Sequence, residues 1–268
     1  MELKQLCEGI HLQEEVRREV EAFCRNPGFD RLGMLREGLK NMETEAQARE
    51  ELGRQLGKDP KRFGMLACML ACAADLHKWY QEKGISDRVF FDTMGCFTRF
   101  IEECREITGS RAFDREWWTA RQVSGKLFRL GALEYEMIYN EDKPIVSMHI
   151  PSDAVLTNES FDNSIEEARS FFAEHFPEYG SSAYICHSWL LAPELGELLP
   201  GNSRILAFQR RFRIVKVDYQ GDDYIQWVFK TRGLPTAELP EETLLQRNMK
   251  RHLMAGGKVG NGLGVCRM

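Results

Sequence analysis

Two histidines are the side chains in this sequence that are best suited to acid–base chemistry. His149 and His187 each stand near the end of a segment rich in β-branched and apolar residues, a composition typical of a β-strand. An imidazole titrates close to neutral pH, so it can remove a proton from an attacking amine. If the two strands are parallel neighbours, both rings lie at one edge of a sheet, and we expect one of them to be the catalytic base. The alternative is a pair of structural histidines bonded to backbone or water.

Three other side chains could also react. Cys186 precedes His187, but adjacent strand residues point to opposite faces, so that imidazole cannot readily activate the thiol. A buried core cysteine is the simpler interpretation. Glu134 and Glu136 alternate on a predicted strand and could replace a histidine as the base. Solubilising charges on an edge strand are the simpler interpretation of that pair.

A second group of residues could bind an anion such as a nucleotide phosphate. Ser203 is a good N-cap for a short apolar-periodic helix, and Arg204 and Arg210 lie on or beside that helix. Ser152, which follows the strand of His149, completes this set of cofactor-binding candidates. A solvated basic face is the alternative interpretation of the arginines.

The hydrophobic pattern changes its period near residue 121. From residue 1 to 121 the apolar residues recur at helical spacing, so we expect an all-helical domain. From residue 122 to 268 the period is mixed, and we expect a β-sheet flanked by helices. The fold class predicted for the whole chain is therefore α+β, with two domains.

The second half of the chain is predicted to follow the order β-β-β-α-β-α-β-β-α. A helix is expected from the capping-box spacing of Ser164 to Glu167, and a last helix from Pro240. The glycine-rich end from Gly256 is expected to form a helix cap with a flexible or extended tail. The predicted strands are Lys126 to Leu130, Leu133 to Tyr139, Ile145 to Ile150, Ala183 to Trp189, Arg213 to Tyr219 and Tyr224 to Lys230.

Composition narrows the classes of function. The 268 residues carry a formal net charge of -5, which argues against a nucleic-acid partner. No apolar run approaches the length of a membrane span, and the N-terminus lacks a signal-peptide core. The 8 cysteines show neither paired spacing nor a metal-ligand set, so we expect reduced thiols, no metal and a cytoplasmic location. The oligomeric state stays open.

Five segments resemble a bacterial family of GNAT-like acyltransferases that join an N-terminal helical (N-acyltransferase N-terminal) domain to a GNAT-like C-terminal domain. The resemblance spans essentially the whole chain and is strongest from about residue 122 to 212. The segments are RLGALEYEM, SMHIPSD, FFAEHFP, ICHSWLLAPEL and LPGNSRILAFQRRF.

The resemblance implies a mixed sheet whose two central parallel strands splay apart to receive the pantetheine arm of an acyl-CoA. It further implies acyl-CoA or acetyl-CoA as donor and a small-molecule amine as acceptor, and the positions of His149 and His187 on their strands make one of them the expected base. One feature departs from the family pattern, because the segment after His149 lacks the glycine-rich turn that usually closes on the pyrophosphate. Two alternatives therefore stay open: a non-catalytic ligand- or partner-binding protein, and a hydrolase built on Ser188 or Cys186.

Overall fold

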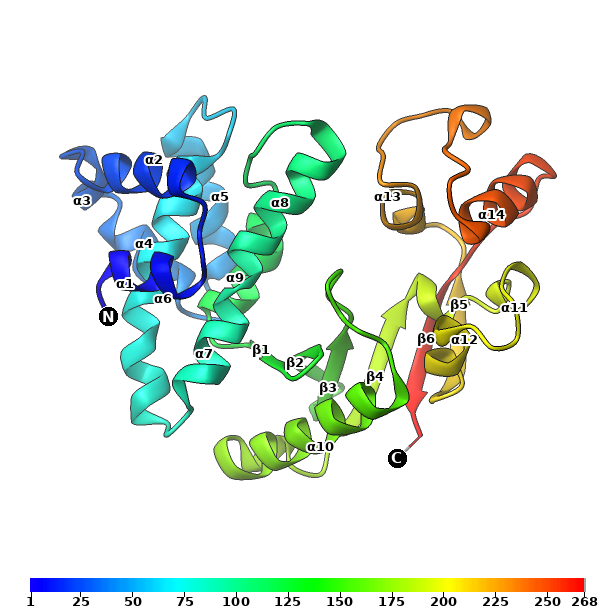
Figure 1. Ribbon diagram of the computed structural model, residues 1–268. Coiled ribbons are helices and arrows are strands. Elements are labelled where there is room, and N and C mark those ends of the chain that lie inside the picture. Colours follow the sequence, from blue (N-terminus) through cyan, green and yellow to red (C-terminus); the bar gives the residue numbers. More distant parts are fainter. Residues whose placement is uncertain (268) are drawn as a thin grey trace. The chain divides into compact units, whose positions relative to one another are not determined.

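A computed structural model describes residues 1–267, and the chain divides into two compact units, Met1–Arg129 and Leu130–Met268 (Figure 1). The first unit is helical, as predicted. Its helices within the described residues are α1 (Leu3–Gly9), α2 (Glu14–Cys24), α3 (Gly28–Arg31), α4 (Gly33–Leu39), α5 (Glu45–Leu56), α6 (Phe63–Glu82), α7 (Asp87–Met94), α8 (Cys96–Thr108) and α9 (Glu116–Val123).

Helix α6 is the centre of the first unit. It is apolar on nearly every side, and helices α1, α2, α4, α5, α7 and α9 all pack against it. A helix that is hydrophobic all round has to be enclosed by others, which explains why this unit needs no sheet. The chain is interrupted at Gly95, which follows α7 and precedes α8.

Three buried thiols in the first unit should make it less stable at alkaline pH. Burial raises the pKa of Cys7, Cys68 and Cys72 to about 12, from an ordinary value of 9.0. Between these values the unfolded chain loses a thiol proton that the folded chain keeps, so stability is present below pH 9 and is lost as the pH rises. We expect the free energy of unfolding to fall by about 1 kcal/mol per thiol between pH 8 and pH 10.

Urea unfolding at the two pH values measures this fall. The variant carrying Cys68→Ala and Cys72→Ala is the control, because its stability should fall less steeply with pH than that of the unchanged chain. Equal slopes for the two proteins would contradict the account.

All eight cysteines are free in the structure, so denaturant should expose eight titratable thiols.

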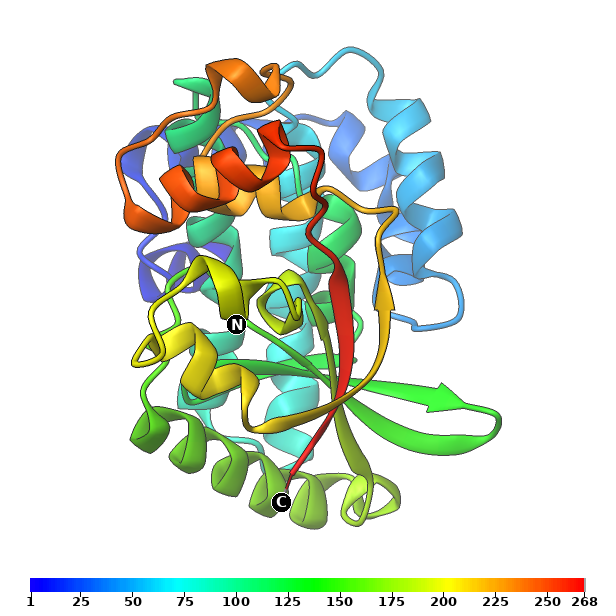
Figure 2. The same ribbon diagram turned by 90° about the vertical axis from the view of Figure 1, so that its right-hand side faces the viewer.

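The second unit is built on one mixed sheet with the strand order β1-β2-β3-β4-β6-β5. Strands β3 and β4 form its parallel pair, as predicted, and the hairpin of β2 and β3 extends beyond the rest of the sheet (Figure 2). The strands are β1 (Leu127–Leu130), β2 (Leu133–Asn140), β3 (Lys143–His149), β4 (Ala183–Ser188), β5 (Phe212–Asp218) and β6 (Asn261–Cys266).

Helix α10 (Asn158–His175) follows β3 and packs against one face of the sheet, where the Phe172 ring meets the Tyr184 ring. The prediction that this helix starts at Ser164 is wrong, because Thr157 and Ser160 form a capping box about two turns earlier. Ser164 is buried instead. Its hydroxyl lies 2.9 Å from the Tyr135 hydroxyl and donates to the Leu130 carbonyl oxygen at 2.5 Å, which ties the helix to the first hairpin.

Short helices connect the remaining strands. The predicted strand from Tyr224 to Lys230 is wrong, because these residues form α13, in which Tyr224 and Phe229 are buried. Its aromatic and β-branched composition suits either structure, and packing decides between them. The connecting helices are η1 (Pro177–Tyr179), η2 (Trp189–Leu191), α11 (Leu195–Leu198), α12 (Arg204–Gln209), α13 (Asp223–Phe229), η3 (Thr236–Glu238) and α14 (Leu244–Met254).

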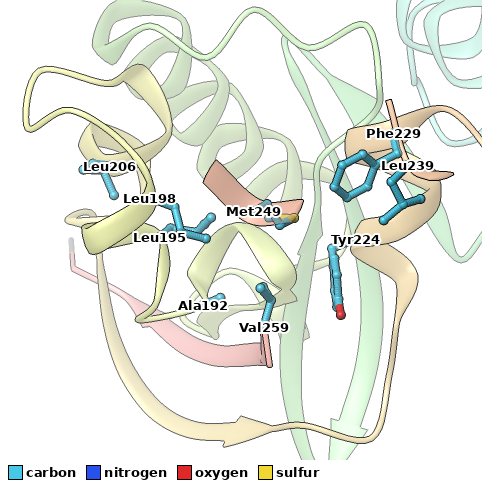
Figure 3. Packing of buried hydrophobic residues seen from close by; sticks show 9 residues of the cluster. All are labelled: Ala192, Leu195, Leu198, Leu206, Tyr224, Phe229, Leu239, Met249 and Val259. Atoms are coloured by element: carbon cyan, nitrogen blue, oxygen red, sulfur yellow. The ribbon is translucent and has the colours of Figure 1, made fainter. Parts of the chain in front are cut away.

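A hydrophobic cluster holds the segment between β5 and β6 in place. The segment contributes Tyr224, Phe229, Leu239 and Met249, while the segment between β4 and β5 contributes residues from α11 and α12 (Figure 3). The last helix begins after Thr243, whose side chain accepts from the backbone N–H of Gln246, so the predicted start at Pro240 is wrong.

The glycine-rich end of the chain is a strand rather than a flexible tail. Strand β6 lies between β4 and β5 and pairs antiparallel with both, as Figure 1 shows in red. Gly262 is required there, since a Cβ atom at this position would lie 2.5 Å from the carbonyl oxygen of Leu191. Glycines allow η2 to cross close over this strand, which is a reason for glycine inside a strand.

Candidate active site

The two histidines predicted to be catalytic occupy equivalent positions on the parallel strands. The last paired residues of β3 and β4 are Met148 and Cys186, and His149 and His187 each follow by one residue. Because side chains alternate along a strand, both imidazoles lie on the face opposite to that of Met148 and Cys186. The expected parallel arrangement of these strands is therefore confirmed.

His149 contacts a buried carboxylate. Its Nε2 atom lies 3.0 Å from Oε2 of Glu136, which stands on the neighbouring strand β2. The side chain of His149 is 19% exposed and that of Glu136 is 7% exposed. A carboxylate at this distance can accept a proton from Nε2 and orient the ring.

The carboxylates of β2 are not the solubilising charges that the sequence suggested. Strand β2 lies between β1 and β3, so it is not an edge, and Glu134 and Glu136 are both buried. Glu134 is paired in register with His149. The alternation of these glutamates was visible in the sequence, but their partner was not, because the register between strands comes from the fold.

His187 and Cys186 differ sharply in their surroundings. His187 is exposed and lies opposite Leu263 of strand β6. Cys186 points to the other face and is fully buried, and burial raises the pKa of its thiol far above the ordinary value. A thiol that stays protonated at neutral pH is a poor nucleophile, which disfavours a hydrolase built on Cys186.

The anion-binding candidates do not gather in one cluster. The Ser203 hydroxyl caps α12 by accepting from the backbone N–H of Ile205 at 3.2 Å. Arg204 and Arg210 are exposed at opposite ends of that helix. Ser152 is exposed and lies in the connection from β3 to α10.

The connection from β3 to α10 is shorter than the sequence suggested. It runs from residue 150 to Thr157, and the backbone N–H of Ala154 donates to the Pro151 carbonyl oxygen in a turn without glycine. The first turn of α10 receives its own cap from Thr157. The glycine-rich turn expected of this fold is therefore replaced by a proline-containing one.

Comparisons with known proteins agree with this architecture. The N-acyltransferase N-terminal domain matches residues 1–125, and the GNAT-like C-terminal domain matches residues 127–266. A helical unit followed by a mixed sheet with a central parallel pair is the arrangement that defines this class of acyltransferase. The chain belongs to the family that joins these two domains.

Solved structures with the same fold include several complexes of an acyltransferase. One complex, with decanoyl-CoA and teicoplanin, matches with a TM-score of 0.82 at 24% identity. The match covers 99% of this chain and 88% of the acyltransferase chain. A second, with CoA and 10C-Teicoplanin, has a TM-score of 0.83 at 25% identity, with coverage of 99% and 87%. Among curated proteins, none matches the chain.

No helix within residues 1–267 is long and apolar enough to cross a membrane. Across the same residues, no group of three or more histidine, cysteine, aspartate or glutamate side chains could hold a metal ion.

Proposed function

We propose that this protein transfers an acyl group from acyl-CoA to the amine of a small molecule, with His149 as the general base. The observation that carries the proposal is the contact between half-buried His149, at the end of β3, and buried Glu136, beside the parallel strand β4. Membership of an N-acyltransferase family and structural relatives bound to decanoyl-CoA and teicoplanin support the donor and a small-molecule acceptor.

The reaction follows from the geometry of this pair. The amine nitrogen attacks the thioester carbonyl carbon, and its proton moves to Nδ1 of His149 while Glu136 stabilises the imidazolium. The C–S bond then breaks, the amide forms, and the imidazolium returns the proton to the departing CoA thiolate. A backbone N–H of the strands holds the negative charge that develops on the carbonyl oxygen.

The remaining candidates have supporting roles in this proposal. His187 is the second candidate for the base, since it shares the sheet face of His149. Ser152, Ser203, Arg204 and Arg210 are proposed to contact the CoA phosphates as separate points of attachment. Eight free cysteines fit a reducing cytoplasm, where we place the protein.

Binding of the donor is the first test of this proposal. We expect decanoyl-CoA, octanoyl-CoA and acetyl-CoA to raise the melting temperature in a thermal-shift measurement. A ligand at 100 times its Kd stabilises a protein by about 2.7 kcal/mol. CoA without an acyl group is the matched control and should bind more weakly than the best donor. No shift with any acyl-CoA would contradict the proposal. That result would favour a non-catalytic binding protein, the alternative that the missing glycine-rich turn left open.

A further inference from the structure

The first unit holds a pocket that is separate from the histidine pair. Its volume is about 560 Å³, within the range of roughly 300–1,000 Å³ that small-molecule sites occupy. One wall is a face of α5, formed by Ala46, Arg49, Glu50 and Gly53. Arg62, which precedes α6, and Glu116, the first residue of α9, form the other side.

The pocket is open beside Gly53 of α5. A Cβ atom at Gly53 would have no other atom within 4 Å, so the space beside this glycine is open. Glycine inside a helix costs stability relative to alanine. Neither packing nor a positive φ angle requires a glycine at this position. The open space beside Gly53 is therefore the feature that sets this position apart from the rest of α5.

The charged groups of the pocket are incompletely paired. Nη2 of Arg62 lies 2.8 Å from Oε1 of Glu116, while Oε2 of the same carboxylate is buried without a hydrogen-bond partner among the described residues. Within the same residues, Nε of Arg49 is also buried and makes no hydrogen bond; its nearest carboxylate oxygen, from Glu45, is 3.8 Å away. Leaving buried donors and acceptors unpaired is costly.

These charges define the chemistry of a ligand. The two arginines and the two glutamates of the lining cancel, so the pocket favours a molecule that is neutral overall but carries both signs. The fork of a guanidinium suits a carboxylate, and a carboxylate side chain suits an ammonium group. Both unpaired atoms, Glu116 Oε2 and Arg49 Nε, are buried from solvent. Rotation of the Glu116 carboxylate, which is a soft torsion, would bring its second oxygen to the ligand.

We propose that this pocket binds a free α-amino acid, with its carboxylate on Arg49 and Arg62 and its ammonium group on Glu116 and Glu50. Arg62 also has a backbone φ of 55°, a left-handed value that is unfavourable for arginine. This conformation holds Arg62 directly before α6, where its side chain reaches Glu116.

Thermal-shift measurements on the full chain with each of the twenty common L-α-amino acids test this site. At least one of them should raise the melting temperature by about 5 °C at 100 times its Kd. The corresponding amine without the carboxylate, and the acid without the amine, should produce little or no shift. Shifts of equal size with either fragment, or no shift with any amino acid, would overturn the assignment.

Two variants and a control locate the response. Gly53→Phe fills the open space and should abolish the shift, whereas Gly53→Ala leaves space and should retain it. Arg49→Met keeps the side-chain stem and should weaken binding by about tenfold or more, which is the loss expected for a charge-assisted contact. An unchanged shift in Gly53→Phe and Arg49→Met, once circular dichroism shows that both are folded, would contradict the proposal. None of these results depends on acyl transfer.

Discussion

Replacing His149 with alanine should lower kcat for acyl transfer by about 10²–10⁴-fold and leave the fold intact. The ring is 19% exposed and contacts Glu136, so its removal takes away a base without emptying the core. Steady-state kinetics with a saturating acyl-CoA measures the change, and circular dichroism checks the fold.

Two further variants separate the roles of the neighbouring side chains. Glu136→Gln keeps the shape of the partner but removes its charge, so kcat should fall less than in His149→Ala. His187→Ala should lower kcat by less than about tenfold, because this ring is exposed and lies opposite Leu263 of β6. A larger loss in His187→Ala than in His149→Ala would move the base to β4. Full activity in both would rule out a histidine base.

A side chain at Gly262 should destabilise the second unit strongly. In Gly262→Ala the new Cβ atom would lie 2.5 Å from the backbone oxygen of Leu191 and 2.8 Å from its Cβ atom. The obstacle is backbone, so strand β6 or helix η2 must move, and we expect a loss of about 3 kcal/mol or more in the free energy of unfolding.

Gly196→Ala is the matched control for this prediction. A Cβ atom at Gly196, which lies in α11, would meet nothing within 4 Å, and alanine favours a helix over glycine. Urea unfolding should therefore show Gly196→Ala to be as stable as the unchanged chain or slightly more stable. Equal stability of the Gly262→Ala and Gly196→Ala variants would show that β6 does not pack closely under η2.

Much of the fold followed from local patterns in the sequence. The helical period of the first unit, the first two strands and the strands of both histidines were each predicted from alternation, capping residues and turn residues. The parallel pairing of β3 and β4 came from the family resemblance, and the structure confirms it.

The errors came from segments whose structure depends on distant partners. Strand β6 was missed because Gly260 precedes it and Gly262 and Gly264 lie within it, and glycine disfavours a strand. Glycine is found inside a strand where another segment crosses closely, as η2 does here. The residues of α13 have strand-like composition, and only the hydrophobic cluster selects a helix. Ser164 has the spacing of a capping box, but Thr157 has the same spacing and lies nearer the strand.

The sequence predicted the two histidines of the candidate site but not the contact between His149 and its carboxylate partner. His149 and His187 were found as polar residues near the ends of predicted strands. The carboxylate beside His149 could not be assigned, because the contact joins residues 136 and 149 across two strands whose register a single sequence does not give.

The most direct test of the proposed acyl transfer is product analysis by mass spectrometry. The purified protein is incubated with decanoyl-CoA and a panel of primary amines, in parallel with the His149→Ala variant. We predict the corresponding amide of at least one amine together with free CoA, and a product yield at least about 100-fold lower with His149→Ala. Intact decanoyl-CoA with every amine, or release of free decanoic acid without any amide, would contradict the proposal.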